Sequence, residues 1–184
     1  MATINKLENN KKLIFKHISE DRIDYMFEYV NSDGDLNLQD EFGYSVFMYI
    51  CLTNNDKLFD LSIKNIEKVD LELKENGGNT ALMLCLDNPT FVKKLINLNS
   101  DIDSQNLGGD TPLIISSFTN NIESVRLLLD YAANENILND KNMSFFNYLS
   151  TKNKKIILKE YPTCVYNALS YNGKFSHFIE NFKI

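Results

Sequence analysis

The stretch that decides the fold runs from Asn106 to Tyr131 and reads NLGGDTPLIISSFTNNIESVRLLLDY. Its glycine turn leads into Thr111 and Pro112, which mark a helix start, because the threonine hydroxyl can cap free amides and proline loses no hydrogen bond at the first helical position. A short helix follows. A second helix then carries apolar residues at helical spacing, namely Ile122, Val125, Leu127, Leu128 and Leu129. Neither helix can bury its apolar side alone, so the unit needs copies of itself beside it.

Three further stretches repeat this pattern. Each repeat has a marker residue two positions before a Ser or Thr that starts an apolar run. The markers are Gly43, Gly78, Gly109 and Asn142. The intervals between them are 35, 31 and 33 residues. An acid or amide precedes each marker by three residues, at Asp40, Glu75, Asn106 and Asn139, and a short polar motif lies upstream, at Asp35-Leu36-Asn37, Asp70-Leu71-Glu72, Asp101-Ile102-Asp103 and Asn134-Glu135-Asn136. A register kept through four markers predicts a stacked array.

With these residues the chain resembles the ankyrin repeat family, whose unit of ~33 residues carries a Thr-Pro-Leu-His signature and two antiparallel helices. The resemblance spans about residues 10–162 and implies an all-α solenoid of stacked helix-turn-helix units with short β-hairpin fingers. We expect one domain, made of an N-terminal cap repeat (1–39), repeats at 40–74, 75–105 and 106–138, a degenerate repeat (139–162) and a C-terminal helical cap (163–184).

The chain departs from the family pattern at two places in each unit. The signature histidine is absent, and its positions hold Met48, Met83, Ile114 and Asn147. The glycine that usually ends the second helix is replaced by Asp33, Lys68, Asn99 and Ala132. Asp and Asn tolerate a left-handed backbone, whereas Lys68 and Ala132 should each cost up to ~1 kcal/mol there.

The periodicity also predicts the individual helices. Residues 1–10 are polar and are expected to be frayed or a short cap, and a helix pair over 13–30 is expected to break near Glu20 and Asp21. Helices follow at about 45–53 and 57–66, with two extra residues near 64–68. Pro89 is expected to separate the two helices of its unit, 153–155 to form a turn in the last unit, and Tyr161 and Pro162 to end it.

Composition limits the class of protein. The net charge is −6, but residues 1–140 hold 12 basic and 23 acidic side chains and 141–184 hold 7 basic and 2 acidic, so the acidic repeats argue against nucleic acid. No apolar run approaches the ~20 residues of a spanning helix, and the N-terminus lacks an apolar signal region. We therefore expect a soluble, cytoplasmic protein with no membrane insertion, whose Cys51, Cys85 and Cys164 are reduced structural thiols.

No constellation of residues points to an enzyme. The two histidines, His17 and His177, lie in opposite caps. The glycine pairs at 77–78 and 108–109 lack the lysine and serine or threonine of a phosphate loop, and the loop that begins at Asp33 lacks the glycine and glutamate that a calcium loop requires. The sequence predicts no catalytic residue, no cofactor, no metal and no small-molecule substrate.

The informative feature is an apolar row. In ankyrin-like units the second position after the signature leucine faces the concave groove, and here it holds Tyr49, Leu84, Ile115 and Tyr148. One turn further stand Leu52, Asp87, Phe118 and Thr151, and the fingers contribute Phe42, Tyr44, Leu107 and Asp110. One explanation is that these side chains pack between neighbouring units. The other is a groove with aromatic anchors that binds a partner protein of unknown identity.

Two other functions stay open at this point. Lys152, Lys154, Lys155 and Lys159 could bind an acidic partner or an anionic surface, and a small array without an effector domain could be a structural subunit of a larger assembly. The bias toward Asn, Lys and Ile is typical of AT-rich coding and fits a virus, an intracellular bacterium or a protist, so an interaction with a host protein is a further hypothesis.

Overall fold

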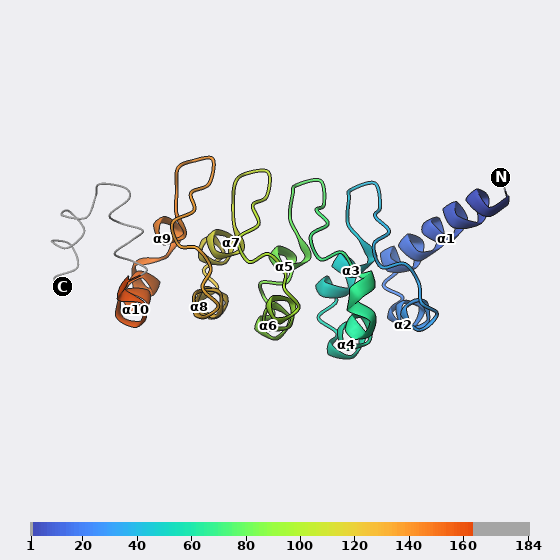
Figure 1. Cartoon of the computed structure of the whole chain (residues 1–184), viewed down its shortest axis with the longest axis horizontal. Helices are drawn as coiled ribbons and strands as arrows, with labels where there is room; N and C mark the ends of the chain where they lie inside the picture. The colour runs from blue at the N-terminus through green and yellow to red at the C-terminus, as the bar shows by residue number, and fades with distance from the viewer. Residues whose placement is uncertain (1, 164–184) are drawn as a thin grey trace.

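The computed structural model describes residues 2–163, with side chains for 11–64 and 66–163. This part is all-α, with ten α-helices, one 3-10 helix and no β-strand. The helices stack in pairs along one axis, with a row of loops, the fingers, rising on one side and the second helices lying on the other (Figure 1). The expected C-terminal cap at 163–184 lies outside the described residues except for Thr163.

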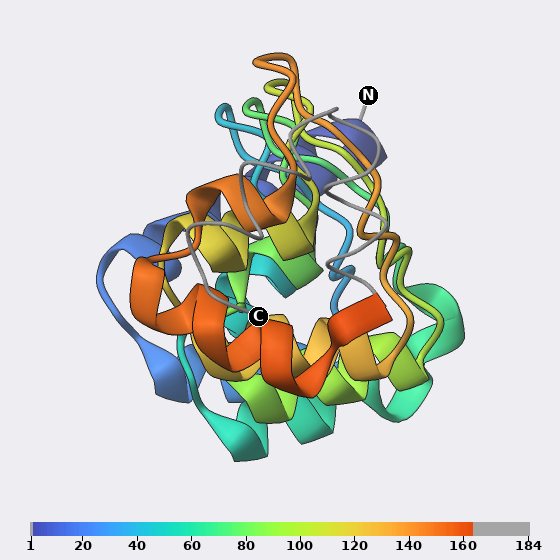
Figure 2. The same ribbon diagram turned by 90° about the vertical axis from the view of Figure 1, so that its left-hand side faces the viewer.

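Each pair consists of a first helix, a short connection and a second helix. In the end-on view the fingers, the first helices and the second helices form three successive layers (Figure 2). The pairs are α1 (Ala2–Ser19) with α2 (Ile23–Asn31), α3 (Val46–Leu52) with α4 (Asp56–Ser62) and the 3-10 helix η1 (Ile63–Lys68), α5 (Ala81–Leu84) with α6 (Pro89–Asn97), α7 (Pro112–Phe118) with α8 (Ile122–Asp130), and α9 (Phe145–Tyr148) with α10 (Thr151–Glu160).

Short polar side chains start both kinds of helix. Thr111 Oγ1 accepts a hydrogen bond from Ile114 N at 3.3 Å, and Pro112 is the first residue of α7, as the sequence predicts. The second helices α4, α6 and α8 begin after an asparagine whose side-chain oxygen accepts from a backbone amide of the first turn, at Asn55, Asn88 and Asn121. Each cap satisfies an amide that the helix itself leaves without a partner.

Backbone hydrogen bonds join neighbouring fingers. Asn76 N donates to Phe42 O at 2.9 Å, Leu107 N to Gly77 O at 3.0 Å, and Asp140 N to Gly108 O at 3.1 Å. This close approach explains the glycine marker, because a Cβ at residue 78, where φ is +83°, would lie 2.6 Å from Leu107 N. The fingers are tight turns rather than strand pairs, and the described residues show a single antiparallel bridge, between Gln39 and Ser45.

The two repeated polar motifs have separate structural roles. The acid or amide before each marker accepts from the amides two and four residues later, as Asn106 Oδ1 does from Gly108 N and Asp110 N, both at 2.9 Å. The upstream motif links units, because its third residue accepts from the first amide of the next motif. These links are Asn37 Oδ1 with Asp70 N, Glu72 Oε1 with Asp101 N, and Asp103 Oδ1 with Asn134 N, each at 2.8 Å.

The helix pairs share one continuous hydrophobic core. Phe59 of α4 stacks on Phe91 of α6 with ring centroids 4.1 Å apart, and both side chains are fully buried. Leu95, Val125 and Leu128 extend the same layer along the second helices. Each pair therefore completes the apolar cover of its neighbours, as the periodicity predicts.

Three expectations from the sequence are wrong. Of the two expectations for residues 1–10, frayed or a short cap, the first is wrong, because residues 2–10 form the first half of α1. The expected turn at 153–155 lies inside α10, because Ser150 caps this helix and Asn153 is buried, with its Nδ2 donating to Asn120 Oδ1 at 2.8 Å. Lys68 does not adopt a left-handed backbone, because η1 absorbs the two extra residues of this unit. Ala132, in contrast, has the strained φ of 60° that its position requires.

Replacing Asn121 with Ala should lower the free energy of unfolding by about 1–2 kcal/mol, because the change removes the cap of α8 and also the bond that Asn121 Nδ2 makes to Leu86 O of the preceding unit at 2.8 Å. The matched variant is Asn55→Ala, which removes a cap of the same kind on α4. Urea denaturation measures both. Equal losses would show that the bond between units contributes nothing.

Replacing Ala132 with Gly should raise the free energy of unfolding by about 1 kcal/mol, because glycine adopts positive φ without the steric cost that a Cβ brings. Ala132 is exposed, so the change removes no packing. The control, Asn99→Gly at the equivalent position with φ of 66°, should gain less, because asparagine tolerates this conformation. Thermal denaturation of both variants gives the comparison, and a destabilised Ala132→Gly protein would refute the strain.

Candidate functional site

The candidate site is the surface formed by the four fingers (40–44, 75–79, 106–110 and 139–143) together with the first helices α3, α5, α7 and α9, which we call the finger–helix face. Figure 2 shows the fingers projecting away from the layer of first helices. The tip-to-tip backbone bonds and the side-chain bonds at each finger base fix this geometry. The face is therefore built before any partner is present.

The predicted apolar row forms the floor of this face. Its four side chains are half-buried, and all of them pack against the core: Tyr49, Leu84, Ile115 and Tyr148. The two tyrosines also tie helix to finger, since Tyr49 OH donates to Asp40 Oδ2 at 2.7 Å and Tyr148 OH accepts from Asn139 Nδ2 at 2.9 Å. Burial and the bond to Asp40 raise the pKa of Tyr49 above its usual value. The row thus packs between units and also keeps part of its surface on the face.

The residues around the row are more exposed than the row itself. Phe42 and Leu107, at two finger tips, expose 59% and 74% of their surface. Leu52 and Phe118, at the ends of α3 and α7, expose 44% and 70%. The remaining finger residue of this apolar set, Tyr44, is half-buried, with its ring centroid 5.5 Å from that of Tyr49. Apolar contact area is therefore available at the rim of the face.

One cluster brings together predicted residues from three elements. The ring of Phe118 meets Tyr148 edge-on, with centroids 5.8 Å apart. Asn139 links Tyr148 to the neighbouring finger, because its Nδ2 also donates to Asp110 Oδ1 at 2.6 Å. Phe118 is thus held against a rigid support while most of its ring faces solvent. Such a side chain loses little conformational freedom on binding.

A hollow at the N-terminal end of the face was not predicted from the sequence. One part of it has a volume of about 430 Å³ and is lined by Phe15, Phe42, Tyr49 and Leu52, among others. A second part of about 720 Å³ shares Phe15, Ser19, Asp40 and Glu41 with the first and extends along Lys11, Lys12 and Lys16. Its outer wall is α1, whose start rises toward the level of the finger tips (Figure 1). This wall could not be predicted from the sequence, because its direction depends on how α1 packs against α2.

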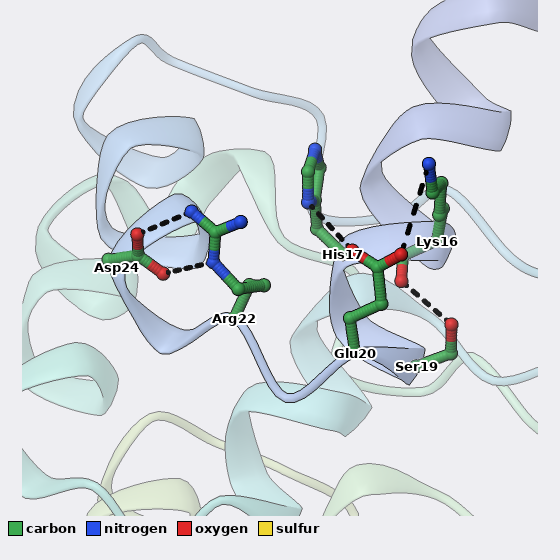
Figure 3. A network of polar contacts seen from close by, with 6 residues as sticks. All are labelled: Lys16, His17, Ser19, Glu20, Arg22 and Asp24. Atoms are coloured by element: carbon green, nitrogen blue, oxygen red, sulfur yellow. Dashed lines mark hydrogen bonds and ion pairs between the residues drawn. The ribbon is translucent and has the colours of Figure 1, made fainter.

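Polar and aromatic contacts surround the turn between α1 and α2. Arg22 binds Asp24 through two hydrogen bonds, of 2.9 and 2.7 Å, and Glu20 lies between Lys16, at 3.8 Å, and His17, at 3.6 Å (Figure 3). His17 stacks on Tyr25 of α2 with ring centroids 3.9 Å apart. These contacts assign His17 to the packing of two helices.

The lysines of the last unit are divided between two environments. Lys152, Lys155 and Lys159 are exposed, and their spacing places them on one face of α10. Lys154 is half-buried, lies 5.6 Å from the ring centroid of Phe146, and has a pKa lowered by burial. Three of the four lysines that the sequence singled out therefore form a solvent-facing basic strip.

Reactive chemistry has little support in the described residues. Cys51 and Cys85 are free and buried, and burial raises the pKa of the Cys85 thiol to about 12. Among the side chains that the structure describes (11–64 and 66–163), no group of three or more His, Cys, Asp or Glu residues could hold a metal ion. None of the helices in this range is both long enough and apolar enough to cross a membrane.

Comparisons with known proteins agree with this geometry. The family model of the ankyrin repeat matches residues 108–140. The chain is 27% identical over 122 residues to neurogenic locus notch homolog protein 1 of Xenopus laevis and 28% identical over 122 residues to notch homolog protein 2 of Homo sapiens, which in both cases covers 65% of this chain. The chain spans about 5% of the length of these curated relatives.

Ankyrin repeats generally mediate protein–protein interactions, and such modules are typically non-enzymatic. The match at 108–140 contains Thr111 and Pro112, and the helix pairs on either side keep the same register as this unit. The fingers at Gly43, Gly78, Gly109 and Asn142 all have the positive φ that their turns require. On this evidence the chain contains an ankyrin repeat at residues 108–140, and its stacked helix pairs form an all-α solenoid consistent with ankyrin repeats.

Proposed function

We propose that the chain is a non-enzymatic protein-binding module that contacts a partner protein through the finger–helix face. The observation that carries the proposal is the distribution of exposed apolar side chains. Five large hydrophobic side chains are exposed among the described residues, and four of them lie on this face: Phe42, Leu52, Leu107 and Phe118. Apolar side chains gathered on one face are typical of an interaction surface.

The division between floor and rim supports this function. The half-buried row of Tyr49, Leu84, Ile115 and Tyr148 would give a partner a rigid apolar floor, and the exposed rim residues would supply most of the contact area. Because the fingers are already bonded to each other, binding would order few groups, and little of the interaction energy would be lost to entropy. Phe118, supported by Tyr148, is the strongest candidate for a hot spot.

The kind of partner follows from charge. The excess of acidic side chains in residues 1–140 disfavours a nucleic acid along the array, so a protein is the proposed partner. A cytoplasmic setting, with a host protein as one form of the hypothesis, is part of the same proposal, because the buried Cys51 and Cys85 are unpaired thiols.

A second candidate function uses the basic strip of α10. Lys152, Lys155 and Lys159 face solvent together, which suits an acidic partner or an anionic surface. Binding through this strip would fall steeply as the salt concentration rises, whereas binding through the apolar rim would change little. A structural role inside a larger assembly is a third candidate, and a clean monomer at high protein concentration would count against it.

The double variant Leu107→Ser with Phe118→Ser should weaken partner binding by roughly 30-fold, which corresponds to about 2 kcal/mol. Both side chains are mostly exposed, so folding should be unaffected, whereas changes at the half-buried Tyr49 or Ile115 would also alter the core. The partner is identified by affinity capture with mass spectrometry and is then titrated as a purified protein.

The control for this titration is Lys57→Ser with Lys93→Ser, two exposed positions on the second helices α4 and α6. It should leave the affinity unchanged, and circular dichroism should report the same helix content for all three proteins. If the rim variant binds as tightly as the unaltered protein, the interface lies elsewhere and the proposal fails.

A further inference from the structure

The hollow at the N-terminal end of the finger–helix face combines an apolar lining with an unusual charge. Phe15, Phe42, Tyr49 and Leu52 supply apolar surface from α1, the first finger and α3. Lys11, Lys12 and Lys16 stand along the α1 wall in the part that continues from it. Three lysines together are exceptional here, because residues 1–140 hold only 12 basic side chains against 23 acidic ones.

These lysines keep most of their charge available. All three are exposed, and Lys11 and Lys12 make no ion pair with any residue whose side chain the structure describes (11–64 and 66–163). Lys16 is 3.8 Å from Glu20, a contact between exposed groups that contributes little stability. A carboxylate brought to this wall would therefore replace no strong internal pair.

The carboxylates on the opposite side compensate this charge only in part. Asp40 Oδ1 accepts from Phe42 N and Tyr44 N, each at 2.9 Å, and its Oδ2 accepts from Tyr49 OH at 2.7 Å. Both carboxylate oxygens of Asp40 are therefore already hydrogen-bonded within its own unit. Two exposed acidic residues of the lining remain, Glu41 on the same finger and Asp21 at the turn after α1. The hollow thus has a basic wall formed by Lys11, Lys12 and Lys16, an apolar floor, and two carboxylates away from that wall.

We propose that this hollow binds an acidic segment of the partner protein, one that places apolar side chains against Phe15, Phe42 and Leu52 and carboxylates against Lys11, Lys12 and Lys16. The proposal rests on the proposed protein-binding function and specifies the partner at one end of the face. Two connected volumes of about 430 and 720 Å³ offer more room than one side chain needs, so a chain segment is the fitting occupant. Opposite charges across the wall would speed association and select against basic segments.

The test uses the full chain and a displayed library of random 12-residue peptides. Peptides selected on the unaltered protein should be enriched in Asp and Glu next to aliphatic or aromatic residues. Selection on the variant K11E/K12E/K16E should lose that acidic bias, and one selected acidic peptide should bind this variant at least about 10-fold more weakly at low salt. Glutamate is a good helix former, so α1 should persist, and circular dichroism checks it.

The matched control is K152E/K155E/K159E, which reverses the same number of lysines on α10 and should leave both the bias and the affinity unchanged. Selected peptides without an acidic bias, or an acidic bias that survives in K11E/K12E/K16E, would overturn the inference and leave binding through the face intact. A selection that fails on the unaltered protein would overturn it as well. A bias lost only in the α10 variant would overturn it in favour of the basic strip.

Discussion

Hydrogen bonds between successive units are the constraint on which this structure depends. They recur in three layers: finger tip to finger tip through backbone groups, loop to loop through the Asp-x-Asn type of motif, and the start of a second helix to the helix–helix turn of the preceding unit. A single helix pair leaves donors and acceptors open on both sides, and it also exposes one apolar face. Stability is therefore a property of neighbouring pairs, as in other repeat proteins.

This dependence explains how units whose sequences differ from the family pattern keep one fold. The groups that bond between units are mostly backbone amides and carbonyls. Any short side chain with an oxygen acceptor can therefore serve at such a position. Asn, Glu and Asp all occupy the third position of the upstream motif, at Asn37, Glu72 and Asp103, and each accepts from the first amide of the next motif. The exposed apolar side chains at the rim of the finger–helix face are free of this requirement, namely Phe42, Leu52, Leu107 and Phe118. These side chains can vary while the scaffold is unchanged.

Much of the scaffold could be predicted from the sequence, because turn glycines and helical periodicity depend on local geometry. The markers at Gly43, Gly78 and Gly109 gave the register, and Pro112 gave a helix start. The N-terminal half of α1 was missed, since polar residues without an apolar period can still form a helix when the segment continues a packed one. The turn expected at Asn153 was wrong because its buried amide bonds to Asn120 in the preceding unit, a contact that no local pattern reveals.

Less of the candidate site could be predicted. Spacing identified the row of Tyr49, Leu84, Ile115 and Tyr148, but its exposure depends on how far neighbouring helices cover it, which sequence alone does not specify. The hollow beside α1 depends on the direction that α1 takes relative to α2 across the turn at Asp21, where φ is 54°. That direction comes from tertiary packing such as the contact of His17 with Tyr25.

Native-state hydrogen exchange tests the dependence between units most directly. The amides of Asn76, Leu107 and Asp140 lie at finger tips, and each donates to a carbonyl of the preceding finger. If the hydrogen bonds between units hold the stack together, these three amides exchange far more slowly than the amides of unstructured peptides, in spite of their position at loop tips. Exchange at the rate of an unstructured peptide, with the helices still protected, would contradict the account.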